Sequence, residues 1–167
     1  AEGRADEINI CIACNQACLD HTFTGKEVSC LVNPRACHET RLNYAQTTSP
    51  KRIAVVGAGP AGLAYANVAA ERGHQVTLYD AASEIGGQFN LAKQVPGKEE
   101  FYETLRYFKR MIELHDISLQ LNTHVSKELL APGDFDEIVI ATGIKPRTPD
   151  LEGIDHPSVV SYIDVLK

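Results

Sequence analysis

Residues 51–80, KRIAVVGAGPAGLAYANVAAERGHQVTLYD, constrain the fold of this chain more than any other stretch. A β-branched apolar run at 53–56 enters a glycine-rich turn, a helix-like stretch follows and stops at Gly73, and a second apolar run ends on Asp80. Strand, turn, helix and strand, with an acid at the end of the second strand, form the dinucleotide-binding fingerprint in its expected context. The sequence therefore predicts an α/β fold built on a Rossmann-like parallel sheet.

Each glycine of the turn has a physical task. Gly57 allows a tight turn out of the strand, Gly59 lets the backbone approach a pyrophosphate, and Gly62 lets the helix pack close to the strand. The first N–H groups of the helix and its dipole favour phosphate binding there. The predicted pyrophosphate contacts are Gly57, Gly59, Pro60, Ala61 and Gly62. The alternative is a glycine-rich turn that binds nothing, and the complete unit around it argues against that.

Two further features indicate which dinucleotide fits. The Asp80 carboxylate can accept hydrogen bonds from a ribose 2′-hydroxyl and would repel a 2′-phosphate, so the site suits FAD or NAD better than NADP. The apolar run at 135–143 predicts a buried strand of a parallel sheet. It closes with Ala141, Thr142 and Gly143, and a strand followed by Ala-Thr-Gly is typical of FAD-dependent two-domain reductases. We therefore predict that FAD, rather than NAD, occupies this site.

The stretch between these two features adds weaker signals. Gly87 and Gln88, in EIGGQ, are predicted to face the cofactor, with an ordinary turn as an equal alternative. Lys98 could neutralise a cofactor phosphate, although such lysines are more often solvated. Residues 99–114 predict an amphipathic helix with core aromatics. Short strands are expected at residues 117–121 and around Val125.

Length, charge and hydropathy exclude several classes of protein. The chain has 167 residues, about one domain, and its 44% of apolar residues suffices for a core. A net charge of −6 argues against general nucleic-acid binding. No apolar run reaches the roughly 18 residues of a membrane span, and the polar start AEGRADEINI is not a signal peptide. We therefore expect a cytoplasmic protein without nucleic-acid or membrane partners.

All five cysteines lie within residues 11–37. Cys11, Cys14, Cys18 and Cys30 have the spacing C-x2-C-x3-C-x11-C, in which three close thiolates and one distant thiolate can hold a cubane. Thiolates select iron–sulfur clusters, zinc or Cu(I), but structural zinc more often uses two separate C-x2-C pairs. The spacing therefore favours a 4Fe–4S cluster, with zinc and disulfides as alternatives.

Three residues near these cysteines are left out of the ligand set. Cys37 is predicted to be a small buried apolar residue. His21 and His38 accompany a complete set of four thiolates, so we expect both to lie outside it.

The order of these motifs along the chain points to a family. The cysteine spacing is followed by Asn33-Pro34 and Glu39, then by a polar linker at 40–50, and then by GAGPAG. With the stretches CNQACLD, SCLVNPRACHE, EIGGQFN and PGKEEFYETLRY, this pattern resembles the trimethylamine-dehydrogenase-like iron–sulfur flavoproteins over nearly the whole chain. Among them it is most similar to the bacterial NADPH-dependent 2,4-dienoyl-CoA reductases.

The resemblance implies two parts in this chain. Residues 1–50 would be the iron–sulfur segment and linker, and residues 51–167 would be an incomplete FAD-binding domain in which backbone near Val125 meets the adenine. A barrel that binds FMN and the enoyl-CoA, and a domain that binds NADPH, would be the partners of this chain. We therefore expect the chain to be a middle fragment of a longer protein.

In that family a hydride passes from NADPH to FAD, single electrons pass through the cluster to FMN, and FMN reduces a 2,4-dienoyl-CoA in fatty-acid β-oxidation. The resemblance thus implies an oxidoreductase with FAD and a 4Fe–4S cluster in this chain. No catalytic acid or base can be assigned, and we expect the isolated chain not to reduce a dienoyl-CoA. The alternatives are a related amine dehydrogenase or enoate reductase, a glutamate-synthase-like electron-transfer subunit, and a zinc-stabilised nucleotide-binding module without a redox role.

Overall fold

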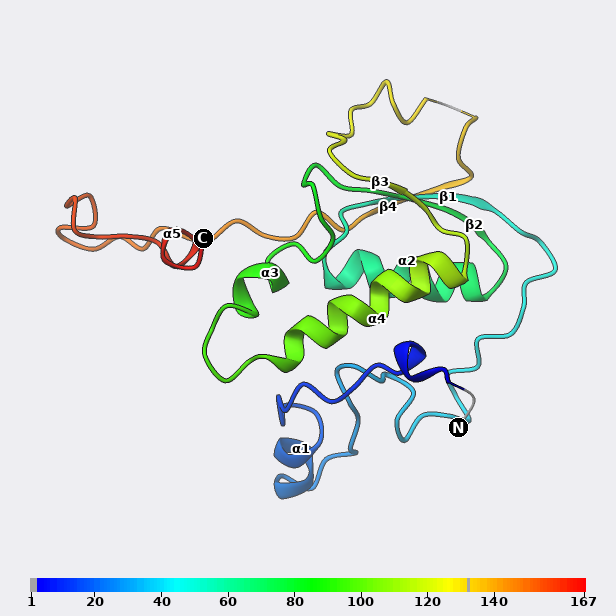
Figure 1. Cartoon of the computed structure of the whole chain (residues 1–167), viewed down its shortest axis with the longest axis horizontal. Coiled ribbons are helices and arrows are strands. Elements are labelled where there is room, and N and C mark those ends of the chain that lie inside the picture. The colour runs from blue at the N-terminus through cyan, green and yellow to red at the C-terminus, as the bar shows by residue number, and fades with distance from the viewer. Residues whose placement is uncertain (1–2, 132) are drawn as a thin grey trace.

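The computed structural model describes residues 3–131 and 133–167 of the chain, which alternate strands and helices after an irregular N-terminal stretch (Figure 1). The helical elements are η1 (Ala5–Glu7), α1 (Leu19–Phe23), α2 (Pro60–Glu71), α3 (Phe89–Ala92), α4 (Glu100–Leu114) and α5 (Tyr162–Val165). The strands are β1 (Arg52–Val56), β2 (Gln75–Tyr79), β3 (Ser118–Gln120) and β4 (Glu137–Ile140). Among the described residues, no helix is both long and apolar enough to cross a membrane.

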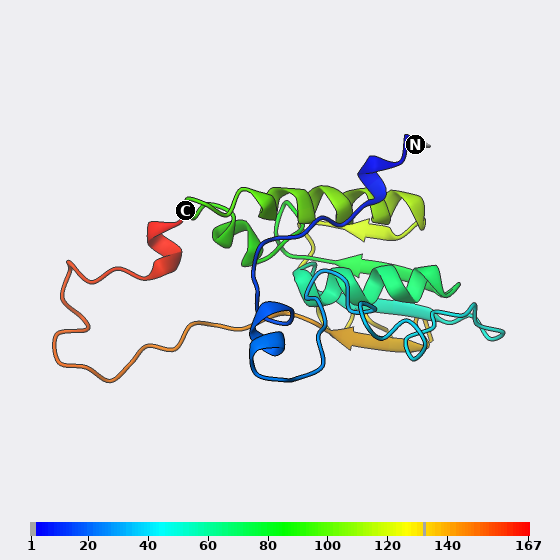
Figure 2. The ribbon, with the colours of Figure 1, turned by 90° about the horizontal axis from the view of Figure 1, so that it is seen from below.

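The strands form one parallel sheet in the order β3-β2-β1-β4. β1 pairs with both β2 and β4, so Val56 lies in register with Tyr79 on one side and with Ile140 on the other. Parallel neighbours need crossover connections, and α2 and α4 lie side by side on one face of the sheet (Figures 1 and 2). The predicted α/β fold with a Rossmann-like parallel sheet is confirmed.

The core lies between the sheet and these two helices. Ile53, Leu63 and Leu78 are at most 1% exposed, and Phe108 of α4 packs against the same cluster. Removal of such side chains from water is the main favourable term in folding. The helix predicted at 99–114 is confirmed as α4. Its Phe101 and Phe108 side chains are buried as expected, whereas Tyr102 on the same helix is 47% exposed.

The predicted burial of the strand at 135–143 is wrong. A parallel strand does form there as β4, but Ile138 is 47% exposed and Ile140 is 68% exposed. The physical reason is its place at the edge of the sheet, because α2 packs mainly against β1 and β2. An apolar run indicates a strand, but its composition does not indicate how many neighbours cover it.

The predicted strand around Val125 is also wrong. The stretch 121–126 has no strand, whereas β3 lies within the predicted 117–121. The N–H group of Thr123 donates to the carbonyl of Asp80 at 2.8 Å, beyond the carboxyl end of β2. The chain therefore leaves the sheet here and forms a loop at its carboxyl edge.

The N-terminal part of the chain crosses the helix layer (Figure 2). No side chain between residues 3 and 50 is fully buried. The stretch is fastened near the C-terminal end of α2, where Gln46 Nε2 donates to the Glu71 carbonyl at 2.5 Å and the Thr47 N–H group donates to the Arg72 carbonyl at 2.8 Å. Two hydrogen bonds therefore fasten the end of the stretch to the end of α2.

Acid should loosen the junction between β1 and β4. Asp136 Oδ2 accepts a hydrogen bond from the Arg52 N–H group at 2.7 Å, and this bond, with the Arg52 guanidinium, lowers the pKa of Asp136. A carboxyl group with a lowered folded-state pKa contributes stability above its unfolded pKa, and the contribution is lost as pH falls through the folded value. We expect Asp136→Asn to lower the free energy of unfolding at neutral pH and to differ little from wild type once Asp136 is protonated.

The measurement is urea denaturation over a pH series. Glu152→Gln, at an exposed position of the C-terminal tail, is the matched control. An effect of Asp136→Asn that is the same at every pH would contradict the expectation.

Candidate dinucleotide site and cysteine segment

The turn between β1 and α2 is built from close backbone contacts. Gly57 has a φ of +108°, and a Cβ atom on it would lie 2.3 Å from the carbonyl oxygen of Ala141. A Cβ atom on Gly62 would lie 1.8 Å from the carbonyl oxygen of Gly57. Only glycine fits at either position, so β1, α2 and the end of β4 meet without side chains between them. This geometry matches the tight turn predicted at Gly57 and the close packing predicted at Gly62.

Gly59, unlike Gly57 and Gly62, has open space where its side chain would be. It caps α2 in an extended conformation, and no atom lies within 4 Å of the place where its Cβ would be. The first N–H groups of any helix lack partners inside the helix, and in α2 these belong to the turn that starts at Pro60. The backbone here is open to an anion, with the positive end of the helix dipole behind it.

Asp80 anchors the glycine turn as well as ending β2. Its Oδ2 accepts a hydrogen bond from the Ala58 N–H group at 2.6 Å, and its Oδ1 accepts one from the Ala82 N–H group at 2.8 Å. A carboxylate has about four acceptor positions, so both oxygens retain capacity for a ribose hydroxyl. The sequence predicted the ribose contact but gave no sign of the bond to Ala58.

A cavity of about 330 Å³ opens beside this carboxylate, within the size range of ligand pockets. It brings together four residues predicted from the sequence, namely Gly57, Asp80, Val125 and Thr142. Its remaining lining residues are Val56, Tyr79, Ala81, Thr123 and His124. The sequence did not indicate Thr123 and His124, because loop residues at this edge carry no motif.

The 86–88 loop lies against the glycine turn. The Gly86 N–H group donates to the Ala58 carbonyl at 2.8 Å, and a Cβ atom on Gly87 would lie 3.2 Å from Gly59 Cα. Gln88 Nε2 donates to the Ile144 carbonyl at 2.8 Å, next to Gly143. The loops at 57–62, 86–88 and 141–143, predicted separately, therefore meet at one place.

Gln88 and Lys98, both predicted to face the cofactor, make contacts with other side chains of the protein. Gln88 Oε1 accepts a hydrogen bond from the Tyr162 hydroxyl of α5 at 2.7 Å, a contact that the sequence did not indicate. Lys98 places its Nζ 4.9 Å from the ring centroid of Phe101 at the start of α4, and it does not line the cavity beside Asp80.

The cysteine segment, residues 11–37, contains five free cysteines. Ala13 and Asn15, on either side of Cys14, have φ values of 53° and 57°, so the chain turns tightly between the first cysteines. Cys18 caps α1, and the Ser29 N–H group donates to the Ala17 carbonyl at 2.8 Å. That bond returns the chain at Cys30 to the neighbourhood of Cys18.

The donor set fits a thiolate-held metal group in type but not in arrangement. Cys14, Cys18 and Cys30 are partly exposed and Cys11 is exposed, and the Ala13 N–H group donates to Cys11 Sγ at 3.3 Å. N–H···S bonds are among the contacts that tune iron–sulfur clusters. Within the part of the chain that the structure describes, no three Cys, His, Asp or Glu side chains converge on a common metal position.

The predicted burial of Cys37 is wrong. This residue is exposed and has a φ of +64°, because it lies in a surface turn where its N–H group donates to Glu39 Oε1 at 3.2 Å. His21 and His38 both contact Glu27, His21 through the carbonyl at 2.8 Å and His38 through the carboxylate at 3.7 Å.

A second cavity, of about 390 Å³, lies between the cysteine segment and helices α2 and α4. Asn33, Pro34 and Arg35 line it from the segment, Asn67 from α2 and Thr104 from α4. Arg35 Nε, Asn67 Oδ1 and Thr104 Oγ1 are buried there without a hydrogen-bond partner among the described residues. Apolar side chains such as Ile12 and Val32 line much of the same cavity, so the seam between segment and helices is hollow and mixed in character, with three buried polar atoms unpaired.

Residues 51–166 match the family described as pyridine nucleotide-disulphide oxidoreductase. The chain belongs to this family. It is 40% identical to a metal reductase of Desulforamulus reducens, over 98% of this chain and 25% of that protein.

Solved structures extend the likeness to the cysteine segment. The chain is similar to 2-naphthoyl-CoA reductase, with a TM-score of 0.93 and 40% identity over 99% of this chain and 25% of the other. It is also similar to the 6-hydroxypseudooxynicotine amine oxidase of Pseudomonas geniculata N1, with a TM-score of 0.85 and 30% identity over 96% of this chain and 26% of the other. The chain thus spans about a quarter of the length of these relatives. The family and these relatives are oxidoreductases, and at this level the predicted class is confirmed.

Gly62 and Gly59 form a matched pair for testing the turn. Gly62→Ala places a methyl group against the Gly57 carbonyl, so we expect the free energy of unfolding to fall by about 3 kcal/mol. Gly59→Ala meets no atom within 4 Å and should change it by less than about 0.5 kcal/mol. Urea denaturation measures both, and equal effects of the two variants would contradict this account.

Proposed function

We propose that this chain is the FAD- and 4Fe–4S-binding part of a larger oxidoreductase that uses NADPH to reduce a conjugated acyl-CoA. The observation that carries the proposal is that the loops at 57–62, 86–88 and 141–143 meet at one place, beside the open backbone of Gly59. Bound FAD would supply hydride chemistry, and a 4Fe–4S cluster on the cysteines would supply one-electron transfer. FMN and NADPH would bind to the barrel and the second nucleotide domain of the longer protein.

The residues of this chain bind, orient and shield. Open N–H groups at the start of α2 would donate hydrogen bonds to the pyrophosphate, and Asp80 would accept a hydrogen bond from a ribose hydroxyl. The loops at 86–88 and 141–143 would exclude water from the flavin end. The residues that would hold FAD are Gly57, Gly59, Pro60, Ala61, Gly62, Asp80, Gly87, Gln88, Lys98, Val125, Ala141, Thr142 and Gly143.

Cys11, Cys14, Cys18 and Cys30 would hold the cluster. Support comes from their free thiols and from the Ser29–Ala17 bond that returns the fourth cysteine to the neighbourhood of Cys18. A zinc ion on the same thiolates, without redox work, is the alternative. It predicts a colourless protein with one zinc per polypeptide.

We further propose that the substrate is a 2,4-dienoyl-CoA of fatty-acid β-oxidation, in the cytoplasm. The likeness to a reductase of another unsaturated acyl-CoA, 2-naphthoyl-CoA, supports this substrate class. The likeness to an amine oxidase supports the second candidate, an amine dehydrogenase of the same architecture. Turnover assays of the intact protein with a 2,4-dienoyl-CoA and with a methylated amine separate the two, and turnover by this chain alone would contradict the need for the longer protein.

Removal of one cysteine should remove the cluster. We expect the intact, anaerobically purified protein to show broad iron–sulfur absorption, with iron near four per polypeptide as in a 4Fe–4S cluster. Cys30→Ala should lose most of this iron, whereas Cys37→Ala, the matched control, should keep it. Iron, zinc and flavin are quantified together with the visible spectrum. One zinc and no iron in the wild-type protein would contradict the cluster.

Gly59→Ala should weaken FAD binding without unfolding the protein. Its methyl group would lie where a pyrophosphate approaches the backbone, so we expect the dissociation constant for FAD to rise about tenfold or more, which is at least about 1.4 kcal/mol. Fluorescence titration of deflavinated intact protein measures the affinity. An unchanged affinity would show that FAD does not approach Gly59.

A further inference from the structure

Helix α4 contacts the cofactor side of the molecule through its apolar face. Phe101 stacks on Phe89, with ring centroids 4.4 Å apart, directly after the 86–88 loop. Leu105 Cδ2 lies 2.9 Å from the place where a Cβ atom on Gly86 would be. The helix therefore holds the loop that lies against the glycine turn.

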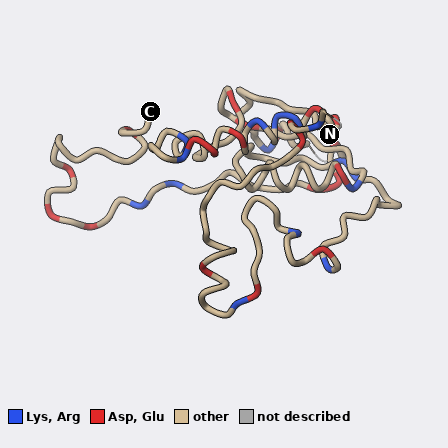
Figure 3. Tube along the Cα trace, turned by 60° about the horizontal axis from the view of Figure 1, so that its bottom comes forward, with Lys and Arg blue, Asp and Glu red and all other residues tan. Residues whose placement is uncertain are grey.

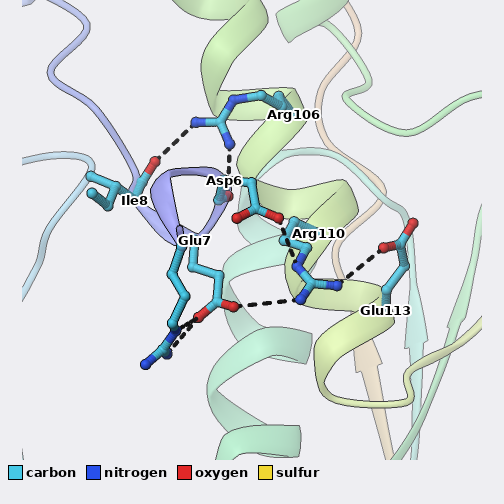
Figure 4. A network of polar contacts seen from close by, with 7 residues as sticks. Asp6, Glu7, Ile8, Arg106, Arg110 and Glu113 are labelled. Carbon is cyan, nitrogen blue, oxygen red and sulfur yellow. Dashed lines mark hydrogen bonds and ion pairs between the residues drawn. The ribbon is translucent and has the colours of Figure 1, made fainter. Parts of the chain in front are cut away.

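Arg106, on the same helix, binds the main chain of the N-terminal stretch. Its Nη1 donates to the Asp6 carbonyl at 2.6 Å and its Nη2 donates to the Ile8 carbonyl at 3.1 Å (Figure 4). Its Nε donates to Glu103 at 2.5 Å, which fixes the guanidinium from behind. A planar group that spans two carbonyl oxygens sets both the place and the direction of the backbone it binds.

Arg110, one turn further along α4, binds the acidic side chains of the same stretch. It forms ion pairs with Asp6 at 3.0 Å, Glu7 at 3.4 Å and Glu113 at 3.5 Å (Figure 4). Fully exposed ion pairs contribute little, but the Arg110 side chain is 34% exposed and that of Glu7 only 12%. Figure 3 shows charges of both signs side by side where the N-terminal end meets the helix layer.

These contacts reach the cysteines through Asn9. Its Nδ2 donates to the Val32 carbonyl at 2.9 Å, so the chain just before Cys11 is tied to the chain just after Cys30. Both ends of the stretch that contains the four predicted ligands therefore meet beside the backbone that Arg106 holds. No side chain in residues 3–50 is fully buried, so these hydrogen bonds and ion pairs contribute to where the stretch lies, beside the apolar side chains that line the seam.

We propose that Arg106 and Arg110 are positioning residues, which hold the cysteine segment at a fixed place relative to the 86–88 loop. α4 links the segment and the loop, because Phe101 and Leu105 pack beside the loop while the two arginines bind the N-terminal stretch. The inference rests on the proposed function, under which this link fixes the separation between bound flavin and bound cluster.

The test compares three variants of the intact protein. Arg106→Met with Arg110→Met removes the hydrogen bonds and ion pairs of both arginines. Arg106→Lys with Arg110→Lys keeps the charges but cannot bind two carbonyl oxygens with one planar group. Lys109→Met, the control, removes one charge from an exposed position of the same helix. Amide hydrogen exchange is followed in residues 11–30 and in residues 51–80. We expect exchange in 11–30 to rise about tenfold in the methionine variant, less in the lysine variant and not in Lys109→Met, with 51–80 unchanged.

A second readout concerns the redox centres. In protein that carries flavin and iron, the methionine variant should slow bleaching of the cluster after NADPH addition by about tenfold, with an unchanged dissociation constant for FAD. Unchanged exchange in 11–30, or an equal rise in 51–80, overturns the proposal. Because exchange can be measured without iron, absence of a cluster would contradict the proposed function and leave this inference testable on its own.

Discussion

The backbone contact of Gly62 with the Gly57 carbonyl, and of Gly57 with the Ala141 carbonyl, fixes the geometry on which the rest of the site depends. It brings the end of β1, the start of α2 and the end of β4 to one point, closer than any side chain would allow. Asp80 then ties the turn to the end of β2 through the Ala58 N–H group. Gly59 lies between these fixed positions, and its own backbone stays open because no atom lies within 4 Å of where its Cβ would be.

The elements that the sequence predicted are those in which local pattern and final environment agree. The turn at 57–62 needs glycine for reasons that act within a few residues, and α4 carries an apolar face long enough to be recognised by its period. β4 shows the limit of such reasoning. Its apolar run identified a parallel strand, but the exposure of Ile138 and Ile140 depends on which neighbours cover an edge, and that is a property of the whole sheet.

The contacts that the sequence did not predict join residues far apart in the chain. Arg106 meets Ile8, and Gln88 meets Tyr162, through bonds between polar side chains or main-chain groups that carry no motif. The prediction that Cys37 is buried is wrong for a related reason, since residue type alone does not distinguish a buried cysteine from one in a surface turn. Residue type restricts what a position can do, whereas long-range partners decide what it does.

The two parts of the chain reach order in different ways. The dinucleotide turn is shaped by a packed core and by glycine contacts within the chain itself. The cysteine segment has no fully buried side chain, borders a hollow seam and leaves its thiols unconverged within the described residues. For a segment of this kind, the free energy of binding a metal group is also free energy of local folding. The contacts of α4 with residues 6–8 hold the start of this segment, which has few buried side chains of its own to fix it.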